Sequence, residues 1–302
     1  MPIRALVDLP APAKLNLFLH VVGRRDDGYH LLQSVFVLID WCDTLHVERR
    51  GDGRLARHDL GRALPADDLT LRAARLLQAE SGTTAGADLS IDKRVPWGAG
   101  LGGGSSDAAT TLLALNQLWG LHWPRARLLA LAARLGADVP FFVGGRNAFV
   151  EGIGERLTPV ELTPAWYAVV KPAATIATPT VFADPSLVRD TEAVILSGFF
   201  EDTGQRAESG EGRGVAVLAQ GFGRNDLQPV AERHCPEVAE VRRWLESRFG
   251  NGRMTGSGSA VFARAGTADR PDATLPAQFP APGWEGRMCR GLPEHPLVHW
   301  AG

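Results

Sequence analysis

The chain has 302 residues, with 32 Lys and Arg against 34 Asp and Glu, which gives a formal net charge of −2. A hydrophobic content of 45% is typical of a globular protein with one or two domains, and the near-neutral charge argues against nucleic acid as a partner. Three isolated cysteines fit neither a disulfide framework nor a zinc motif, and no histidine pair has metal-site spacing, so we expect no protein-ligated transition metal.

The start of the chain has no secretory signal, and its longest conspicuous apolar run, residues 35–39, is far too short to span a membrane. Cysteines without a disulfide pattern are typical of a reducing compartment. We therefore predict a cytoplasmic protein without a membrane partner. The sequence does not indicate an oligomeric state.

Strands dominate the first third of the chain. Apolar residues alternate with other side chains over residues 13–21, which predicts a strand with Lys14 and Asn16 together on one face. A polar loop over residues 23–30 contains Tyr29 and His30, which by default are loop residues at the end of a hairpin. The elements predicted next are strands at 35–40 and 44–49, a helix at 69–80 and a short strand around 89–91.

Glycine is in excess, with 34 residues, and five of them fall within residues 98–104. This cluster lies between the strand around 89–91 and a helix that Ser105, Ser106 and Asp107 would cap and that would run to about residue 119. Glycines let the backbone approach a ligand closely, and successive N–H groups before a helix form a phosphate cradle. The predicted phosphate-binding residues are Pro96, Trp97, Gly98, Ala99, Gly100, Leu101, Gly102, Gly103, Gly104, Ser105 and Ser106.

Two common phosphate loops do not fit this segment. Its spacing matches the dinucleotide fingerprint, but no acidic residue stands between Asp107 and Asp138 to hold a ribose. A Walker loop needs a Lys followed by Ser or Thr after the glycines, and none is present. A nucleoside triphosphate loop of another type is the remaining interpretation.

The rest of the chain mixes helices with strands. Pro124 opens a helix over residues 125–135 that Gly136 closes, and residues 148–151 and 167–171 are strand-like. A boundary near residues 157–164 predicts two domains, 1–160 and 161–302. The predicted loops of the second domain are residues 197–214, rich in glycine, serine and charge and expected to be mobile, and residues 266–283.

Several residues are candidates for chemistry, each with an ordinary alternative. Asp138 is either a catalytic base or a helix N-cap ahead of Pro140, and Lys14 is either its partner in a cleft or an ordinary edge lysine. The pair 93–94 either ends a strand in solvent or borders a nucleotide. The glycine-containing segment 255–259 is either a tight turn or a loop that closes over a ligand.

Together these segments resemble the GHMP kinase superfamily, named from galacto-, homoserine, mevalonate and phosphomevalonate kinases. The resemblance runs nearly end to end, through residues 11–17, 27–30, 96–109, 136–140, 225–227 and 255–259, in that order. It is strongest to the members that phosphorylate a cytidylyl-methylerythritol. It implies an α+β fold of two domains with the active site in the cleft between them.

The resemblance also implies a reaction and its residues. ATP with Mg²⁺ would donate its γ-phosphoryl group to the 2-hydroxyl of the small-molecule cytidylyl substrate, in non-mevalonate isoprenoid biosynthesis. Asp138 matches the catalytic base and Lys14 its partner. The residues that match substrate contacts are Asn16 and Thr178, Tyr29 and Phe182, which would stack the cytosine, and His30, which would hydrogen-bond to it. No acidic Mg²⁺ ligand has a clear counterpart, and segment 197–214 resembles an insertion.

Two other functions are weighed against this one. A GHMP kinase for a small alcohol such as homoserine or mevalonate would have no use for a cytosine clamp made by Tyr29, His30 and Phe182. A catalytically inert nucleotide-binding protein on the same fold is disfavoured because Lys14 and Asp138 are both present.

Overall fold

The protein is described by a computed structural model that covers residues 3–194, 222–267 and 269–301. The predicted loop 197–214 lies outside the described residues. The strands are β1 Ala5–Arg24, β2 His30–Arg50, β3 Leu55–Asp59, β4 Gly86–Asp92, β5 Ala148–Glu151, β6 Arg156–Pro159, β7 Ala165–Lys171, β8 Arg253–Met254, β9 Val261–Thr267 and β10 Glu285–Leu292. The helices are α1 Leu69–Ser81, α2 Gly103–Leu118, α3 Arg125–Leu135, α4 Val139–Gly144, α5 Thr178–Ala183, α8 Gln228–His234, α9 Pro236–Phe249 and the short 3₁₀ helix η1 Val298–Trp300.

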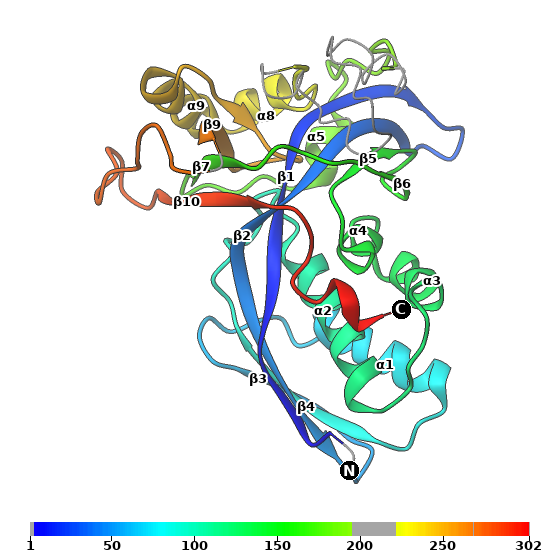
Figure 1. Ribbon diagram of the computed structural model, residues 1–302. Coiled ribbons are helices and arrows are strands. Elements are labelled where there is room, and N and C mark those ends of the chain that lie inside the picture. Colours follow the sequence, from blue (N-terminus) through cyan, green and yellow to red (C-terminus); the bar gives the residue numbers. More distant parts are fainter. Residues whose placement is uncertain (1–2, 195–221, 268, 302) are drawn as a thin grey trace, which may run out of the picture.

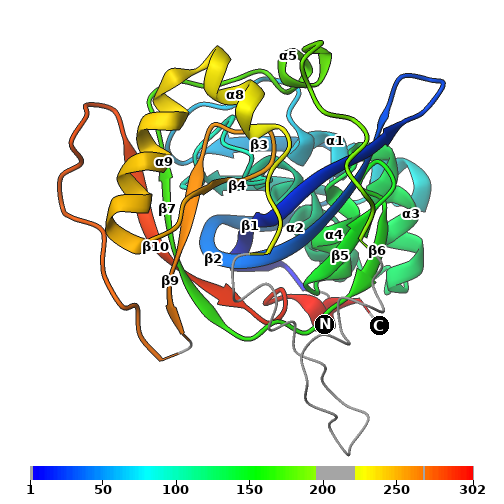
Figure 2. The ribbon, with the colours of Figure 1, turned by 90° about the horizontal axis from the view of Figure 1, so that it is seen from above.

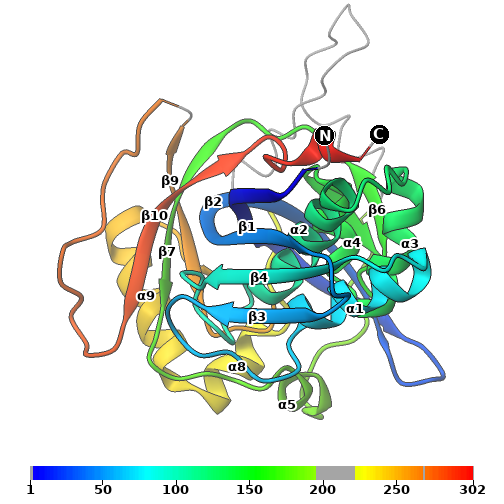
Figure 3. The ribbon, with the colours of Figure 1, turned by 90° about the horizontal axis from the view of Figure 1, so that it is seen from below.

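The described strands join into one mixed sheet in the order β3-β4-β2-β10-β7-β9-β8, with β1 and β5 also paired to β2. The long antiparallel hairpin of β1 and β2 runs from the lower to the upper part of the molecule (Figure 1). At the lower end β3 and β4 lie side by side and parallel (Figure 3). The two predicted parts of the α+β fold are therefore connected through the sheet, chiefly by β2 and β10.

Helices cover the sheet separately in the two parts. In the lower part α1 to α4 pack on the sheet and enclose a core that includes Leu77, Leu89 and Leu112. In the upper part α8 and α9 cover β7 and β9, with Val241, Leu245 and other apolar side chains buried between them (Figure 2). None of the described helices is long and apolar enough to cross a membrane.

The prediction of two strands at 35–40 and 44–49 is wrong, because the chain forms the single strand β2. The polar residues between them do not end the strand, since Cys42 and Asp43 pair with Pro12 and Ala11 of β1. The pairing register shifts between Pro12 and Ala13, so an irregularity in β1 absorbs the change that the sequence pattern indicated as a break.

The predicted start of α2 is also wrong. Ser105, Ser106 and Asp107 do not cap this helix, which begins at Gly103 with Gly102 as its N-cap and no side-chain cap bond. The N–H of Ser106 donates to the carbonyl of Gly102, so the serines already lie inside the first turn. Glycines therefore carry the chain directly from the loop into the helix.

Residues 294–301 return to the lower part of the molecule, where Figure 1 shows them beside α2 and α3. The amide of Gln117 donates to the carbonyl of Trp300 at 2.6 Å. The guanidinium of Arg125 donates to the carbonyls of Val298 and Ala301, which lie in this segment. The core of the first half is thus completed by residues from the other end of the chain.

Candidate active site

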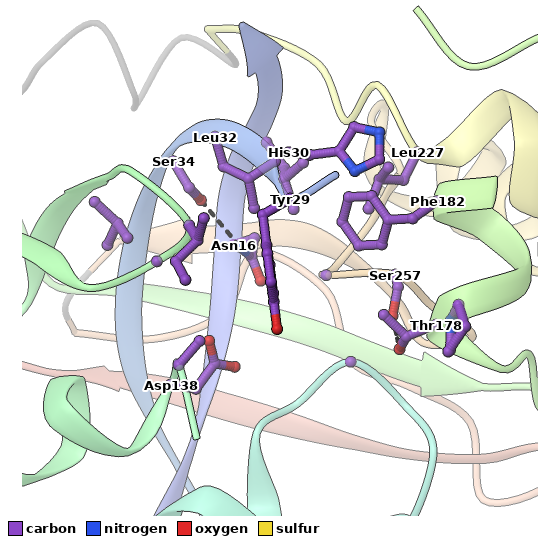
Figure 4. Close-up of a pocket in the computed structure, with 18 of the residues that line it drawn as sticks. Asn16, Tyr29, His30, Leu32, Ser34, Asp138, Thr178, Phe182, Leu227 and Ser257 are labelled. Carbon is purple, nitrogen blue, oxygen red and sulfur yellow. Dashed lines mark hydrogen bonds between the residues drawn. The ribbon is translucent and has the colours of Figure 1, made fainter. Parts of the chain in front are cut away.

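A cavity of about 740 Å³ lies between the two parts of the fold. Its walls come from β1, β2, the loop before α2 and the start of α4 on one side, and from α5 and residues 256–258 on the other. Figure 4 shows Asp138 at one end of this pocket, and His30 and Phe182 close together at the other. The pocket therefore has two ends of different construction.

Lys14 and Asp138 meet in the pocket. The Lys14 side chain is buried on β1, and its Nζ lies 3.6 Å from Oδ2 of Asp138. Asp138 occupies the N-cap position of α4, yet its side chain makes no capping bond and is 32% exposed. The side chain of Asp138 therefore does not cap the helix that it precedes, and its carboxylate faces the cavity.

Burial changes the pKa of Lys14. Desolvation lowers the pKa of Lys14, and the nearby Asp138 carboxylate opposes that shift. Nζ also lies 4.6 Å from the centroid of the Phe36 ring, a distance at which the ring face attracts a cation. The ammonium is therefore held in a low-dielectric site, where its charge acts strongly on whatever occupies the cavity.

Asn16 fixes the position of Lys14. Its Oδ1 accepts a hydrogen bond from Lys14 Nζ at 2.5 Å, and its Nδ2 donates to Ser34 Oγ at 3.0 Å. Its backbone N–H donates to Oγ1 of Thr255 at 2.9 Å. β1, β2 and the segment 255–259 are thus joined by one polar network around the lysine.

The glycine loop passes close to other backbone. Gly100 has φ of 73°, and a Cβ atom there would lie 2.3 Å from the carbonyl oxygen of Thr255. Gly102 has φ of 71°, and a Cβ atom there would lie 2.9 Å from the Phe142 ring. Only glycine satisfies both requirements, so the loop packs directly against Thr255 and Phe142 while both glycines line the cavity.

The segment 255–259 is more than a tight turn, because it pairs with the glycine loop. The N–H groups of Ser259 and Ala260 donate to the carbonyls of Gly98 and Ala99 at 3.2 and 3.1 Å. Its residues Gly256, Ser257 and Gly258 line the cavity. Ser257 also shares a hydrogen bond of 2.7 Å with Thr178, so the two ends of the pocket are linked.

A buried ion cluster supports the loop from behind. Nζ of Lys93 contacts Asp43 and lies 2.7 Å from Oδ2 of Asp107 in the second turn of α2. Asp43 also accepts the N–H groups of Arg94 and Val95, at 2.6 and 2.7 Å. Lys93 is therefore not the solvated end of a strand, and the cluster ties the entry of the loop to its helix.

The other end of the pocket is built from aromatic side chains. Tyr29 lies between β1 and β2 and is 60% exposed. His30 and Phe182 have ring centroids 5.0 Å apart and an interplanar angle of 34°. In Figure 4 the Tyr29 ring projects into the pocket, beside His30 and Phe182. A flat ligand has aromatic faces available to it here.

The structure brings most of the predicted site residues to one cavity. Those that line it are Lys14, Asn16, Tyr29, His30, Gly98, Gly100, Gly102, Asp138, Thr178 and Phe182. The others do not. Pro96 and Trp97 border a separate cavity of about 100 Å³ beside Lys93 and Arg94, Ala99 and Leu101 are buried, and residues 103–106 form the first turn of α2.

Sequence reasoning missed several residues of the site. Ser34 and Thr255 complete the network around Asn16, and Arg189 contacts His30 from residues after α5. Their partners are 18, 239 and 159 residues away, so no local pattern signals them. For Thr255 the one available signal was its place beside the glycines of segment 255–259.

Comparison with known proteins identifies two family domains. The family described as GHMP kinases N terminal domain matches residues 68–146, and the one described as GHMP kinases C terminal matches residues 207–275. A 4-diphosphocytidyl-2-C-methyl-D-erythritol kinase of Methylibium petroleiphilum is 63% identical, over 100% of both chains. One of Variovorax paradoxus is 55% identical, over 99% of both chains.

The solved structures similar to this chain differ in how much sequence they share with it. A crystal structure of 4-(cytidine 5'-diphospho)-2C-methyl-D-erythritol kinase is 38% identical, with a TM-score of 0.70 over 89% of this chain and 91% of that chain. A homoserine kinase from Cytophaga hutchinsonii has a TM-score of 0.66 over 97% and 96% of the two chains, but is 15% identical. The second likeness concerns the fold alone.

Proposed function

This chain belongs to the 4-diphosphocytidyl-2-C-methyl-D-erythritol kinases of the GHMP kinase superfamily, and we propose that Asp138 and Lys14 carry out its phosphoryl transfer. The enzyme is an ATP-dependent phosphotransferase that acts on the 2-hydroxyl of 4-diphosphocytidyl-2-C-methyl-D-erythritol, in non-mevalonate isoprenoid precursor biosynthesis. One observation carries the proposal: the Lys14–Asp138 pair lies in a cavity that the glycine loop borders on one side and Tyr29, His30 and Phe182 on another.

In the proposed reaction the substrate 2-hydroxyl oxygen attacks the γ-phosphorus of ATP, and the bond from that phosphorus to the β-phosphate oxygen breaks. The hydroxyl proton passes to the carboxylate of Asp138, and ADP leaves. The Lys14 ammonium, 3.6 Å from that carboxylate, attracts the negative charge of the phosphoryl group. Positioning and charge stabilisation therefore supply most of the catalysis.

The phosphates of ATP are proposed to lie against the glycine loop and the N-terminus of α2. Backbone N–H groups and the positive end of the helix would hold them, so no excess of basic residues is needed. This agrees with the net charge of −2. The residues proposed to form or support this site are Pro96, Trp97, Gly98, Ala99, Gly100, Leu101, Gly102, Gly103, Gly104, Ser105 and Ser106.

Mg²⁺ is proposed to enter with ATP. No group of three or more His, Cys, Asp or Glu side chains able to hold a metal was found among the described residues. The hydroxyl of Ser106 lies in the first turn of α2, where it is buried and has no hydrogen-bond partner among the described residues. The ion fits a site made of phosphate oxygens, water and the loop serines, and when bound it would neutralise phosphate charge.

The cytosine is proposed to stack between Tyr29 and Phe182, with His30 as a hydrogen-bonding partner. Asn16 and Thr178 would contact other parts of the substrate. This end of the pocket favours the cytidylyl alcohol over homoserine or mevalonate, because those alcohols carry no ring to stack.

We also propose the division of the chain into domains 1–160 and 161–302, because the walls of the cavity come from both.

Purified full-length protein tests the proposal. With ATP and Mg²⁺ we expect ADP release when 4-diphosphocytidyl-2-C-methyl-D-erythritol is added, and none with mevalonate or homoserine. Phosphorus NMR of the product should show one new monophosphate ester on the 2-oxygen. Turnover of mevalonate or homoserine without turnover of the cytidylyl alcohol would overturn it.

A further inference from the structure

Arg189 makes a directed contact with His30 at the aromatic end of the pocket. Its Nε donates a hydrogen bond to Nε2 of His30 at 3.0 Å. The other guanidinium nitrogens donate to backbone carbonyls of Leu187, Phe182 and Asp184, at 2.9, 3.1 and 2.8 Å. The guanidinium is thus held by the backbone around α5, and its Nε–H points at one nitrogen of the imidazole.

This contact determines where the imidazole proton lies. A guanidinium has donors only, so Nε2 of His30 must accept and is the nitrogen without a proton. The neutral ring then carries its proton on Nδ1. Figure 4 shows the two ring nitrogens on different sides, one toward the Phe182 side of the pocket and the other turned away.

The charges around His30 favour the neutral ring. Burial lowers its pKa, and the cations Arg189 and Arg24 lower it further. The acidic groups on flanking segments have other partners. Asp27 pairs with Arg25 and accepts the N–H of Tyr29, while Asp184 accepts from Ser186 and contacts His234.

On the basis of the proposed function, we propose that Arg189 is a positioning residue that fixes His30 as a neutral imidazole protonated on Nδ1, so that this nitrogen always donates to the base. A cytosine offers acceptors at its ring nitrogen and its carbonyl oxygen. Without Arg189 either ring nitrogen can carry the proton, and only part of the enzyme would present the donor. Arg189 would thereby set base recognition without touching the substrate.

Kinetics on two backgrounds test this role. Arg189→Met keeps an apolar stem but removes the donors, and we expect KM for the cytidylyl substrate to rise about fivefold, as when about a fifth of the enzyme presents the Nδ1 donor. KM for ATP and kcat should stay within about twofold, because the transfer centre is separate. The defect should shrink from pH 8 to pH 6, since an imidazolium carries protons on both nitrogens.

His30→Asn provides the matched background. An asparagine amide nitrogen lies near the position of Nδ1 and donates without help from Arg189. In that background Arg189→Met should change KM by less than about twofold, the signature of two residues that act as a unit. An equal KM defect on both backgrounds, independent of pH, would show that Arg189 only supports the backbone around Phe182.

Histidine-selective ¹⁵N NMR of the unmodified full-length protein tests the tautomer directly, even if Arg189→Met does not fold. The spectrum of His30→Asn assigns the His30 signals. We expect a protonated Nδ1 and an unprotonated Nε2, and the reverse pattern would overturn the inference. The NMR result does not depend on turnover. Absence of activity with the cytidylyl substrate would therefore contradict the proposed function, but it would not change the tautomer found for His30.

Discussion

One end of the pocket is formed mainly by backbone, and the other is formed mainly by side chains. The phosphate end consists of backbone, with glycines at 98, 100 and 102 in the left-handed region, and with Gly98 and Gly100 packed against segment 255–259. The base end consists of side chains, with Tyr29 exposed at the end of a hairpin and Phe182 on a short helix. The first end should fail when a side chain is added, and the second when one is removed.

The largest effect should come from Asp138, which lies at the end of the pocket away from His30 and Phe182 (Figure 4). Asp138→Asn keeps the shape of the side chain but removes the base, and we expect kcat to fall by about 10³-fold. Binding of ATP, followed by fluorescence or calorimetry, should be nearly unchanged because the loop is separate from the carboxylate. Retained turnover would show that Asp138 serves only as the start of α4.

Adding one methyl group tests the phosphate end. In Gly100→Ala the new Cβ would lie 2.3 Å from the Thr255 carbonyl at a φ of 73°, so the loop must move. We expect ATP affinity to fall by about 100-fold and the free energy of unfolding by about 1–3 kcal/mol. Gly51→Ala, with nothing within 4 Å of the added atom, is the control and should behave as wild type. Tight ATP binding by Gly100→Ala would contradict the role of backbone approach.

Removing a ring tests the base end. Tyr29→Ala should raise KM for the cytidylyl substrate by about tenfold, since stacking a base on an aromatic ring contributes about 1–3 kcal/mol. KM for ATP should not change, and Tyr29→Phe should retain the wild-type KM because the ring face remains. If Tyr29→Ala instead altered KM for both substrates equally, the two ends would not be independent.

The smallest effect should come from the link between the ends. Thr178→Val removes the 2.7 Å hydrogen bond to Ser257, and with it the hydroxyl proposed to contact the substrate, while keeping the side-chain volume. One exposed neutral hydrogen bond contributes about 1 kcal/mol, so we expect KM for either substrate to rise about two- to fivefold. Steady-state kinetics with each substrate varied in turn would measure this. A change in kcat alone would place Thr178 at the transfer centre instead.

Local patterns predicted the elements whose boundaries depend on local chemistry. The helix Arg125–Leu135, between Pro124 and Gly136, and the strand Ala148–Glu151 have the predicted bounds. The pocket positions of Lys14, Asn16 and Asp138 also followed from the strand pattern and the motifs. The continuity of β2 did not, because a register shift in the neighbouring strand decides it.

The burial of Lys93 could not be predicted from local sequence patterns either. Lys93 follows a strand and precedes an exposed arginine, which is typical of a surface position. Its burial depends on Asp43 and Asp107, which are 50 and 14 residues away. A buried charge is stable only with such partners, and single-sequence patterns carry no information on them.

The return of residues 294–301 to the lower part of the fold has a consequence for the order of assembly. A chain is synthesised from its N-terminus, and domains often fold as they emerge. Here the side chain of Gln117 donates to the carbonyl of Trp300, and that of Arg125 donates to Val298 and Ala301 as well as to Val143 in the first half. The three carbonyls near the end of the sequence are translated after the rest of the second half. The first half therefore reaches its final packing only once translation has passed these residues.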